Sequence, residues 1–192
     1  NLKRRVSSTS FVRAVFEAGP ALLWQMAKAG TIGQLAQWTV LPLKPWSDAY
    51  LWTWLEDMNL PPQKNIRQAI LRATDGRPGL IIQLHPDLDA GPRILDRVEA
   101  FEASLSNPER ATAVLAGLGV TCEDMRKGLG VIKELSGEKS EEFQRFWDDM
   151  GAREVALPDF LCWADYLSLI RPAGQDRWEI EPFVGKLLDV PA

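Results

Sequence analysis

The stretch that decides the fold is PDFLCWADYLSLIRPAGQDRWEIEPFVGKLLDV, residues 158–190. Pro158 suits the first turn of a helix, because proline lacks an N–H group that this turn would leave unpaired. The apolar residues that follow recur at helical spacing. Pro182 opens a last short helix for the same reason. Between the two helices, the segment Pro-Ala-Gly-Gln-Asp at 172–176 is typical of a turn.

The residues on either side of this turn predict a β-hairpin. Ile170 precedes the turn, and Trp178 and Ile180 follow it at alternate positions. Alternation of this kind is typical of a strand with one buried face. We therefore expect residues 169–181 to form a hairpin.

The rest of the chain predicts helices almost throughout. Ser47, Asn107 and Thr121 are good N-caps, and each has an acidic residue in the turn behind it. Residues 38–43 favour a short extended segment instead, because the proline among them suits a sheet edge or a loop. The predicted helices cover residues 10–18, 20–30, 48–58, 63–74, 80–84, 93–105, 108–117, 121–136, 140–150, 158–168 and 183–190.

The expected fold is mostly α-helical with one small hairpin near the C-terminus. A stretch rich in Pro, Asp and Gly at 85–92 predicts a linker. It divides the chain into two helical subdomains, residues 1–88 and 89–192. Residues 1–96 hold 11 basic and 8 acidic side chains, whereas 97–192 hold 11 and 18. The acidic second half repels nucleic-acid phosphates at long range.

The composition excludes several classes of protein. Of the 192 residues, 46% are hydrophobic and 25% are charged, which excludes a disordered tail, a collagen-like fibre and a disulfide scaffold. No apolar run approaches the roughly 20 residues of a membrane span, so no membrane partner is expected. The start at Asn1 without a signal peptide predicts a fragment or a processed product. Cys122 and Cys162 are expected to be reduced thiols, which predicts a cytoplasmic location.

The sequence shows no catalytic or metal-binding motif. His85 is the only histidine, which argues against a zinc site or a histidine-based triad. A phosphate-binding loop needs a glycine directly before its lysine, but Glu138 precedes Lys139. His85 with Asp87 and Asp89 is better explained as a turn than as a metal site. We therefore assign no catalytic residue, metal or cofactor to this chain; a standalone enzyme would need a pocket with a perturbed acid or base.

Residues 40–82 resemble the lid of P-loop ATPases of the AAA+ and STAND type. In that lid, a short Pro-Leu segment leads from the ATPase core into a helix, and a later helix ends in a Gly-x-Pro turn near the nucleotide. Gly76, Arg77 and Pro78 match this turn, and Asp75 stands where a second glycine is common. The resemblance implies that the turn approaches the adenine or its ribose and that Arg77 reaches the phosphates. It also implies that ATP binds to a catalytic core upstream of this chain.

Residues 140–190 resemble a winged helix, a module that often follows the lid in STAND-type ATPases. Residues 158–168 correspond to the recognition-type helix and residues 169–181 to the wing. Together the two resemblances imply a non-catalytic regulatory module of a larger nucleotide-dependent ATPase. Its lid and winged helix would relay the nucleotide state to a partner, either the upstream ATPase core or another protein subunit.

The alternative is a DNA-binding winged helix that contacts the phosphate backbone through its wing. The candidate phosphate contacts are Arg153, Arg171, Arg177 and Lys186. The basic start, Lys3 to Arg5, adds to them. The predicted recognition helix carries Asp159 and Asp165 and no basic residue, so it does not favour reading of the major groove. Duplex binding that weakens steeply with salt would support this alternative.

Overall fold

The computed structural model describes residues 17–39, 44–88, 93–136, 140–149, 154–175 and 177–191. These residues are mostly helical and form a two-stranded antiparallel hairpin near the C-terminus, which confirms the predicted fold class. The elements are α1 (Pro20–Lys28), η2 (Ile32–Gln37), α2 (Asp48–Asp57), α3 (Lys64–Thr74), α4 (Pro78–Leu88), α5 (Ile94–Ser104), α6 (Pro108–Gly117), α7 (Glu123–Glu134), α8 (Ser140–Asp149), α9 (Leu157–Tyr166), β1 (Ile170–Gly174), β2 (Arg177–Ile180) and α10 (Pro182–Leu188).

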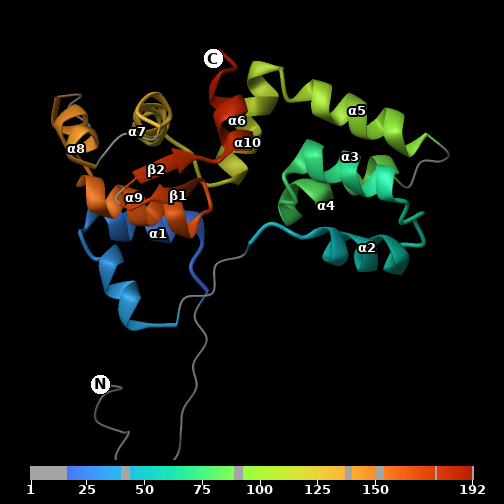
Figure 1. Cartoon of the computed structure of the whole chain (residues 1–192), viewed down its shortest axis with the longest axis horizontal. Helices are drawn as coiled ribbons and strands as arrows, with labels where there is room; N and C mark the ends of the chain where they lie inside the picture. Colours follow the sequence, from blue (N-terminus) through green and yellow to red (C-terminus); the bar gives the residue numbers. More distant parts are fainter. Residues whose placement is uncertain are drawn as a thin grey trace, which may run out of the picture.

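The elements form two groups, which lie side by side in Figure 1. In the first group, α5 packs on α3 and α4, and α2 packs on α3. In the second group, α1 and the 3-10 helix η2 pack on α9, α7 packs on α8 and β2, and α6 packs on α10. The groups do not follow the predicted boundary between residues 88 and 89, because α1 lies with the C-terminal elements and α5 with α3 and α4. Packing groups and domains are different divisions, so the domain boundary between residues 88 and 89 stays a prediction.

Two of the predicted N-caps are confirmed and the third is wrong. The side chains of Ser47 and Asn107 each accept a hydrogen bond from the backbone N–H three residues later, at 3.5 and 3.1 Å. The cap of α7 is Cys122, one residue later than predicted. Thr121 instead donates its backbone N–H to the sulfur of Met125 at 3.1 Å. The hydroxyl of Thr121 also donates to this sulfur, at 3.7 Å, and α7 has no side-chain capping bond.

Helix α4 is longer than predicted and includes part of the predicted linker. It continues through His85 and Pro86 to Leu88. Pro86 has no N–H group to donate to the carbonyl of Ile82, four residues earlier, and Ile82 is exposed. His85 packs its ring against Trp54 of α2, with the ring centroids 5.5 Å apart. The last turn of α4 is thus held by packing that its sequence did not indicate.

Some predicted features lie mostly or wholly outside the described residues. They are the helix at 10–18, the extended segment at 38–43, the basic start at Lys3 to Arg5, Glu138 with Lys139, Asp89, and Arg153. None of the helices in the described ranges combines the length and the apolar content needed to cross a membrane.

The second group is built around an aromatic core on α9. Phe160 and Trp163 are fully buried, and their ring centroids lie 5.2 Å apart. Trp24 of α1 lies 4.9 Å from Trp163, and Trp147 of α8 lies 4.6 Å from Phe160. Aromatic pairs at such distances add to the free energy gained from burial alone. Because the rings come from three helices, α9 is fixed between α1 and α8.

Helix α7 approaches this core closely through Gly128. A Cβ atom built there would lie 2.5 Å from Cζ of Phe160 and 2.9 Å from Cη2 of Trp147. Two residues along the same helix, a Cβ at Gly130 would meet no atom within 4 Å. The two glycines therefore separate the effect of packing from that of helix propensity.

We expect Gly128→Ala to lower the free energy of unfolding by about 1–3 kcal/mol, because the added methyl group overpacks a filled core. Gly130→Ala should raise it by up to about 1 kcal/mol, because alanine is the better helix former. Urea denaturation of the two variants and the wild type measures both changes. Equal effects of the two substitutions would contradict the close approach of α7 to Phe160.

Candidate functional site

The candidate site begins at the turn between α3 and α4. Helix α3 ends at Thr74. Asp75 and Gly76 follow it, and both have left-handed backbone angles, with φ of +53° and +65°. A Cβ atom at Gly76 would lie 2.5 Å from the carbonyl oxygen of Trp46. The N–H of Trp46 donates to the carbonyl of Gly76 at 2.6 Å. Gly76 is therefore required both for the backbone conformation and for the close approach of Trp46.

Arg77 connects this turn to the second group of elements. Its side chain is 8% exposed, and its Nη2 donates to the carbonyl oxygen of Ser168 at 2.6 Å. Ser168 lies two residues before β1 and has a left-handed backbone, with φ of +52°. Nε of Arg77 lies 3.6 Å from the carboxylate of Asp75 and has no hydrogen-bond partner. The structure thus joins two segments that are 91 residues apart in the chain.

The charges at this junction are balanced. Burial lowers the pKa of Arg77, while the carboxylates of Asp75 and Glu181 raise it. Burial also raises the pKa of Asp75, and the positive charges of Arg77 and Lys186 oppose that rise. Two carboxylates therefore face two cations. An anionic ligand would find this junction already neutralised.

The phosphate contact expected of Arg77 stays a prediction. In the structure its guanidinium is already bonded to the carbonyl of Ser168. A phosphate could reach the guanidinium only if Arg77 left Ser168 or if the ligand entered the junction. Gly76 is also buried, whereas Pro78 begins α4 and is partly exposed. In this structure the turn is a buried connection between two groups of elements.

Two of the predicted phosphate contacts of the wing lie near carboxylates in the structure. Arg171 on β1 faces Glu179 on β2, with Nη2 and a carboxylate oxygen 3.2 Å apart. Arg177 is exposed beside the tip, and Lys186 is exposed on α10 near the junction. Arg153 lies outside the described residues. Arg171 is therefore paired with a carboxylate, and Lys186 lies near the carboxylate of Asp75.

Helix α9, which corresponds to the recognition-type helix, is covered on one face. α9 packs on α1, η2 and β1, and its side chains Phe160, Trp163 and Ala164 are fully buried. Asp165 is exposed on it and Asp159 is partly exposed. A helix that reads bases needs an exposed face with hydrogen-bonding side chains of suitable charge. α9 offers acidic groups and a face occupied by other helices.

No catalytic group stands out among the described residues. Burial raises the pKa of the Cys162 thiol, which disfavours the nucleophilic thiolate. Within the described ranges, no three His, Cys, Asp or Glu side chains come together as a set that could hold a metal ion. The turn predicted at His85 is wrong for residues 85–88, which form the last turn of α4, and Asp89 lies outside the described residues.

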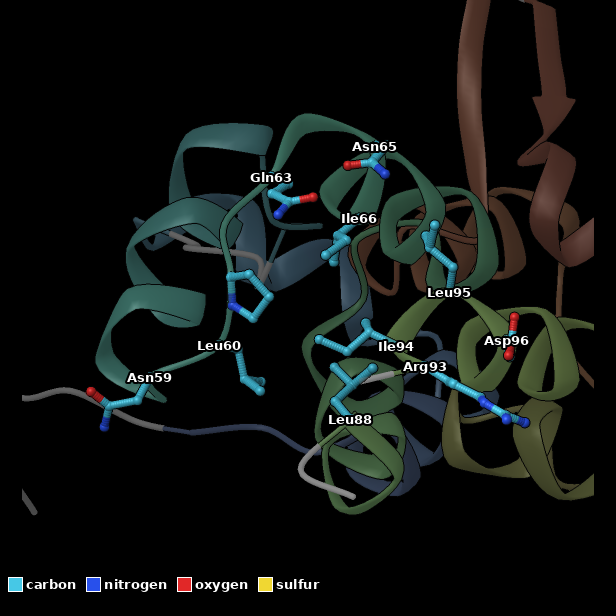
Figure 2. Close-up of a pocket in the computed structure, with 11 residues that line it drawn as sticks. Asn59, Leu60, Gln63, Asn65, Ile66, Leu88, Arg93, Ile94, Leu95 and Asp96 are labelled. Atoms are coloured by element: carbon cyan, nitrogen blue, oxygen red, sulfur yellow. The ribbon is translucent and has the colours of Figure 1, made fainter. Parts of the chain in front are cut away.

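A separate hollow lies in the first group of helices and is shown in Figure 2. It has a volume of about 580 Å³ and lies between the α2–α3 connection, the end of α4 and the start of α5. Its apolar wall comes from Leu60, Ile66, Leu88 and Ile94, all buried. The sequence analysis missed it because the wall residues are ordinary core aliphatics when considered one by one.

Comparison of the chain with protein-family models, with the curated proteins and with the solved structures finds no match in any of the three.

The junction yields a prediction about pH. Because burial raises the pKa of Asp75, the folded chain binds this proton more tightly than the unfolded chain, and the Asp75 contribution to stability increases as the pH falls. Asp75→Asn removes the charge and keeps a residue that tolerates a left-handed backbone. At pH 7 the variant should be the more stable protein. The difference should disappear below pH 3.8, the ordinary value for aspartate.

Urea denaturation of both proteins across this pH range measures the difference. A variant that is less stable than the wild type at pH 7 would show instead that the attraction between Asp75 and Arg77 outweighs burial.

Proposed function

We propose that the chain is a non-catalytic interaction module that couples the turn at Asp75 to Pro78 with the hairpin β1–β2. The observation that carries the proposal is the buried hydrogen bond from Arg77 to the carbonyl of Ser168. In this proposal the chain is the lid and winged helix of a larger nucleotide-dependent ATPase of the AAA+ or STAND type. The nucleotide acts on the turn, and Arg77 passes the displacement to the root of the hairpin.

The energetics of the junction support a relay. A hydrogen bond made by a charged group contributes about 1.5–3 kcal/mol, and an abandoned buried charge costs more. Movement of the turn must therefore either carry Ser168 with it or break this contact. Since α9 is fixed by the aromatic core and leads directly to Ser168, a displacement there would reach both α9 and the hairpin.

The order of elements also supports the proposal. Helices α7, α8 and α9 are followed by the hairpin and α10, which is the order expected of a winged helix. The ion pair of Arg171 with Glu179 and the covered face of α9 favour contact with protein over contact with DNA. In this reading Arg77 is a positioning residue, and the nucleotide lies near the outer side of the turn at Pro78.

The relay predicts a local effect in the chain itself. Arg77→Met keeps much of the apolar volume of the side chain and removes the hydrogen bond to Ser168. We expect amide hydrogen exchange at Leu169 and Glu181, whose backbone bonds frame the root of the hairpin, to accelerate about 10- to 100-fold. Arg72→Met is the matched control, because Arg72 is exposed on α3 and pairs with Glu102 within the first group. Unchanged exchange in Arg77→Met would contradict the coupling.

The ATPase part of the proposal has its own test in the protein as encoded by its whole gene. A phosphate-binding loop followed by an acidic strand, upstream of Asn1 in the same reading frame, is expected. In that protein, ATP should change exchange in the hairpin, and Arg77→Met should abolish this change while nucleotide affinity stays within about threefold. A large loss of affinity with an intact hairpin response would make Arg77 a phosphate contact and would reject the relay.

A further inference from the structure

Helix α2 carries a tryptophan that already contacts one cation. The guanidinium carbon of Arg67 lies 4.6 Å from the ring centroid of Trp52. The same guanidinium donates from Nε and Nη2 to the two carboxylate oxygens of Asp48, at 2.8 and 2.9 Å, and from Nη1 to the carbonyl of Pro62. The Arg67 side chain is 8% exposed. One face of the ring is therefore covered by a cation, which a carboxylate one helical turn away holds in place.

The rest of this ring is open, and a second carboxylate follows it. Trp52 is 43% exposed although Arg67 covers one side of it, and α2 lies at the edge of the first group in Figure 1. Glu56 follows Trp52 by four residues, the same spacing that separates Asp48 from Trp52. Residues four apart are neighbours on a helix surface. The ring thus has a carboxylate one turn before it and another one turn after it, and Glu56 is exposed and forms no ion pair within the described ranges.

The charges at the end of α2 are unfavourably placed. Its last turn contains Glu56 and Asp57 and no basic residue. The C-terminal end of a helix is the negative end of its dipole, where acidic side chains destabilise the helix and basic ones stabilise it. Arg67 and Lys64 supply positive charge beside Asp48, at the opposite end of α2. A cation from outside the chain would therefore relieve the repulsion at the end of α2.

We propose that the end of α2 binds a basic segment of a partner protein, with one arginine side chain between the open face of Trp52 and the carboxylate of Glu56. Arg67 and Asp48 show the same combination of guanidinium, indole and carboxylate on the other face of the ring. Arginine fits better than lysine, because its planar guanidinium stacks on a ring and pairs with a carboxylate at the same time. Asp57 adds attraction at longer range. The proposal is independent of the ATPase role, because it uses no residue of the junction.

The test uses the full chain of 192 residues with ¹⁵N-labelled tryptophan, and Trp52→Leu identifies the Trp52 indole signal by its loss. The probe is acetyl-Arg-Gly-Arg-Gly-Arg-amide. Its matched control carries citrulline, which has nearly the same shape and no charge, in place of each arginine. We expect the arginine peptide to shift the Trp52 signal in a saturable way and the citrulline peptide to bind at least fivefold more weakly. Equal binding of the two peptides, or shifts confined to other tryptophans, would overturn the proposal.

Paired variants separate this site from general attraction to an acidic chain. Glu56→Gln combined with Asp57→Asn should weaken the arginine peptide about two- to fivefold, the loss expected for an exposed ion pair. The same variant should raise Tm by about 1–4 °C, because it removes negative charge from the negative end of the α2 dipole. A site that binds a cation thus becomes more stable when it loses its ligand contact.

Asp148→Asn combined with Asp149→Asn is the matched control. These two carboxylates are exposed in the last turn of α8, in the other group, and their replacement removes the same charge from the chain. The control should change Tm similarly and leave the affinity for the arginine peptide unchanged. Equal weakening by both pairs of substitutions would show unspecific attraction and reject the site. In the chain alone, a Trp52 signal that moves when Lys3, Arg4 and Arg5 are replaced by serine would assign the site to the chain's own basic start and reject the partner segment.

Discussion

The architecture depends on one buried charge. Arg77 leaves the first group of helices at the start of α4 and donates to a backbone carbonyl of the second group, with its side chain 8% exposed. A guanidinium cannot lose its proton in a folded protein, so the charge stays buried where it lies. Asp75 and Glu181 attract it, and Gly76 allows the chain to turn tightly enough to place Arg77 there. Arg110 of α6 adds a second connection, because it donates to Gln83 of α4 at 3.1 Å and lies over the ring of Phe101.

The two groups differ in how they are packed. The second group has an aromatic core in which rings from α1, α8 and α9 contact one another, and a glycine brings α7 against them. The fully buried side chains of the first group are mostly aliphatic, with Trp46, Trp54 and His85 packed at its edge, and a hollow lies between the end of α4, the start of α5 and the connection from α2 to α3. Dense aromatic packing makes the second group stiff, because a filled core resists deformation.

Local chemistry explains which features could be predicted from the sequence. The caps at Ser47 and Asn107, the proline-started helices and the hairpin all depend on neighbouring residues, and all are confirmed. The expected alternation of burial along the strands is not seen, because Trp178 and Glu179 are both half-buried. Pro86 was misinterpreted because a proline in the last helical turn is tolerated when little backbone bonding is lost. The bond of Arg77 to Ser168 could not be predicted. Its acceptor is a backbone carbonyl, and every residue has one, so the amino-acid type gives no indication of it. The hollow at Leu60 could not be predicted either, because it depends on how separate elements are placed in space.

The packing of α1 on α9 affects how the chain folds during translation. Trp24 leaves the ribosome long before Trp163, its partner in the aromatic core, has been synthesised. Contacts between distant residues form slowly, because a large loop must close first. During translation α1 therefore exposes an apolar face that only the last quarter of the chain can cover, and such a face is prone to aggregation until then. This arrangement gives a molecular chaperone a defined interval in which to hold the N-terminal helix.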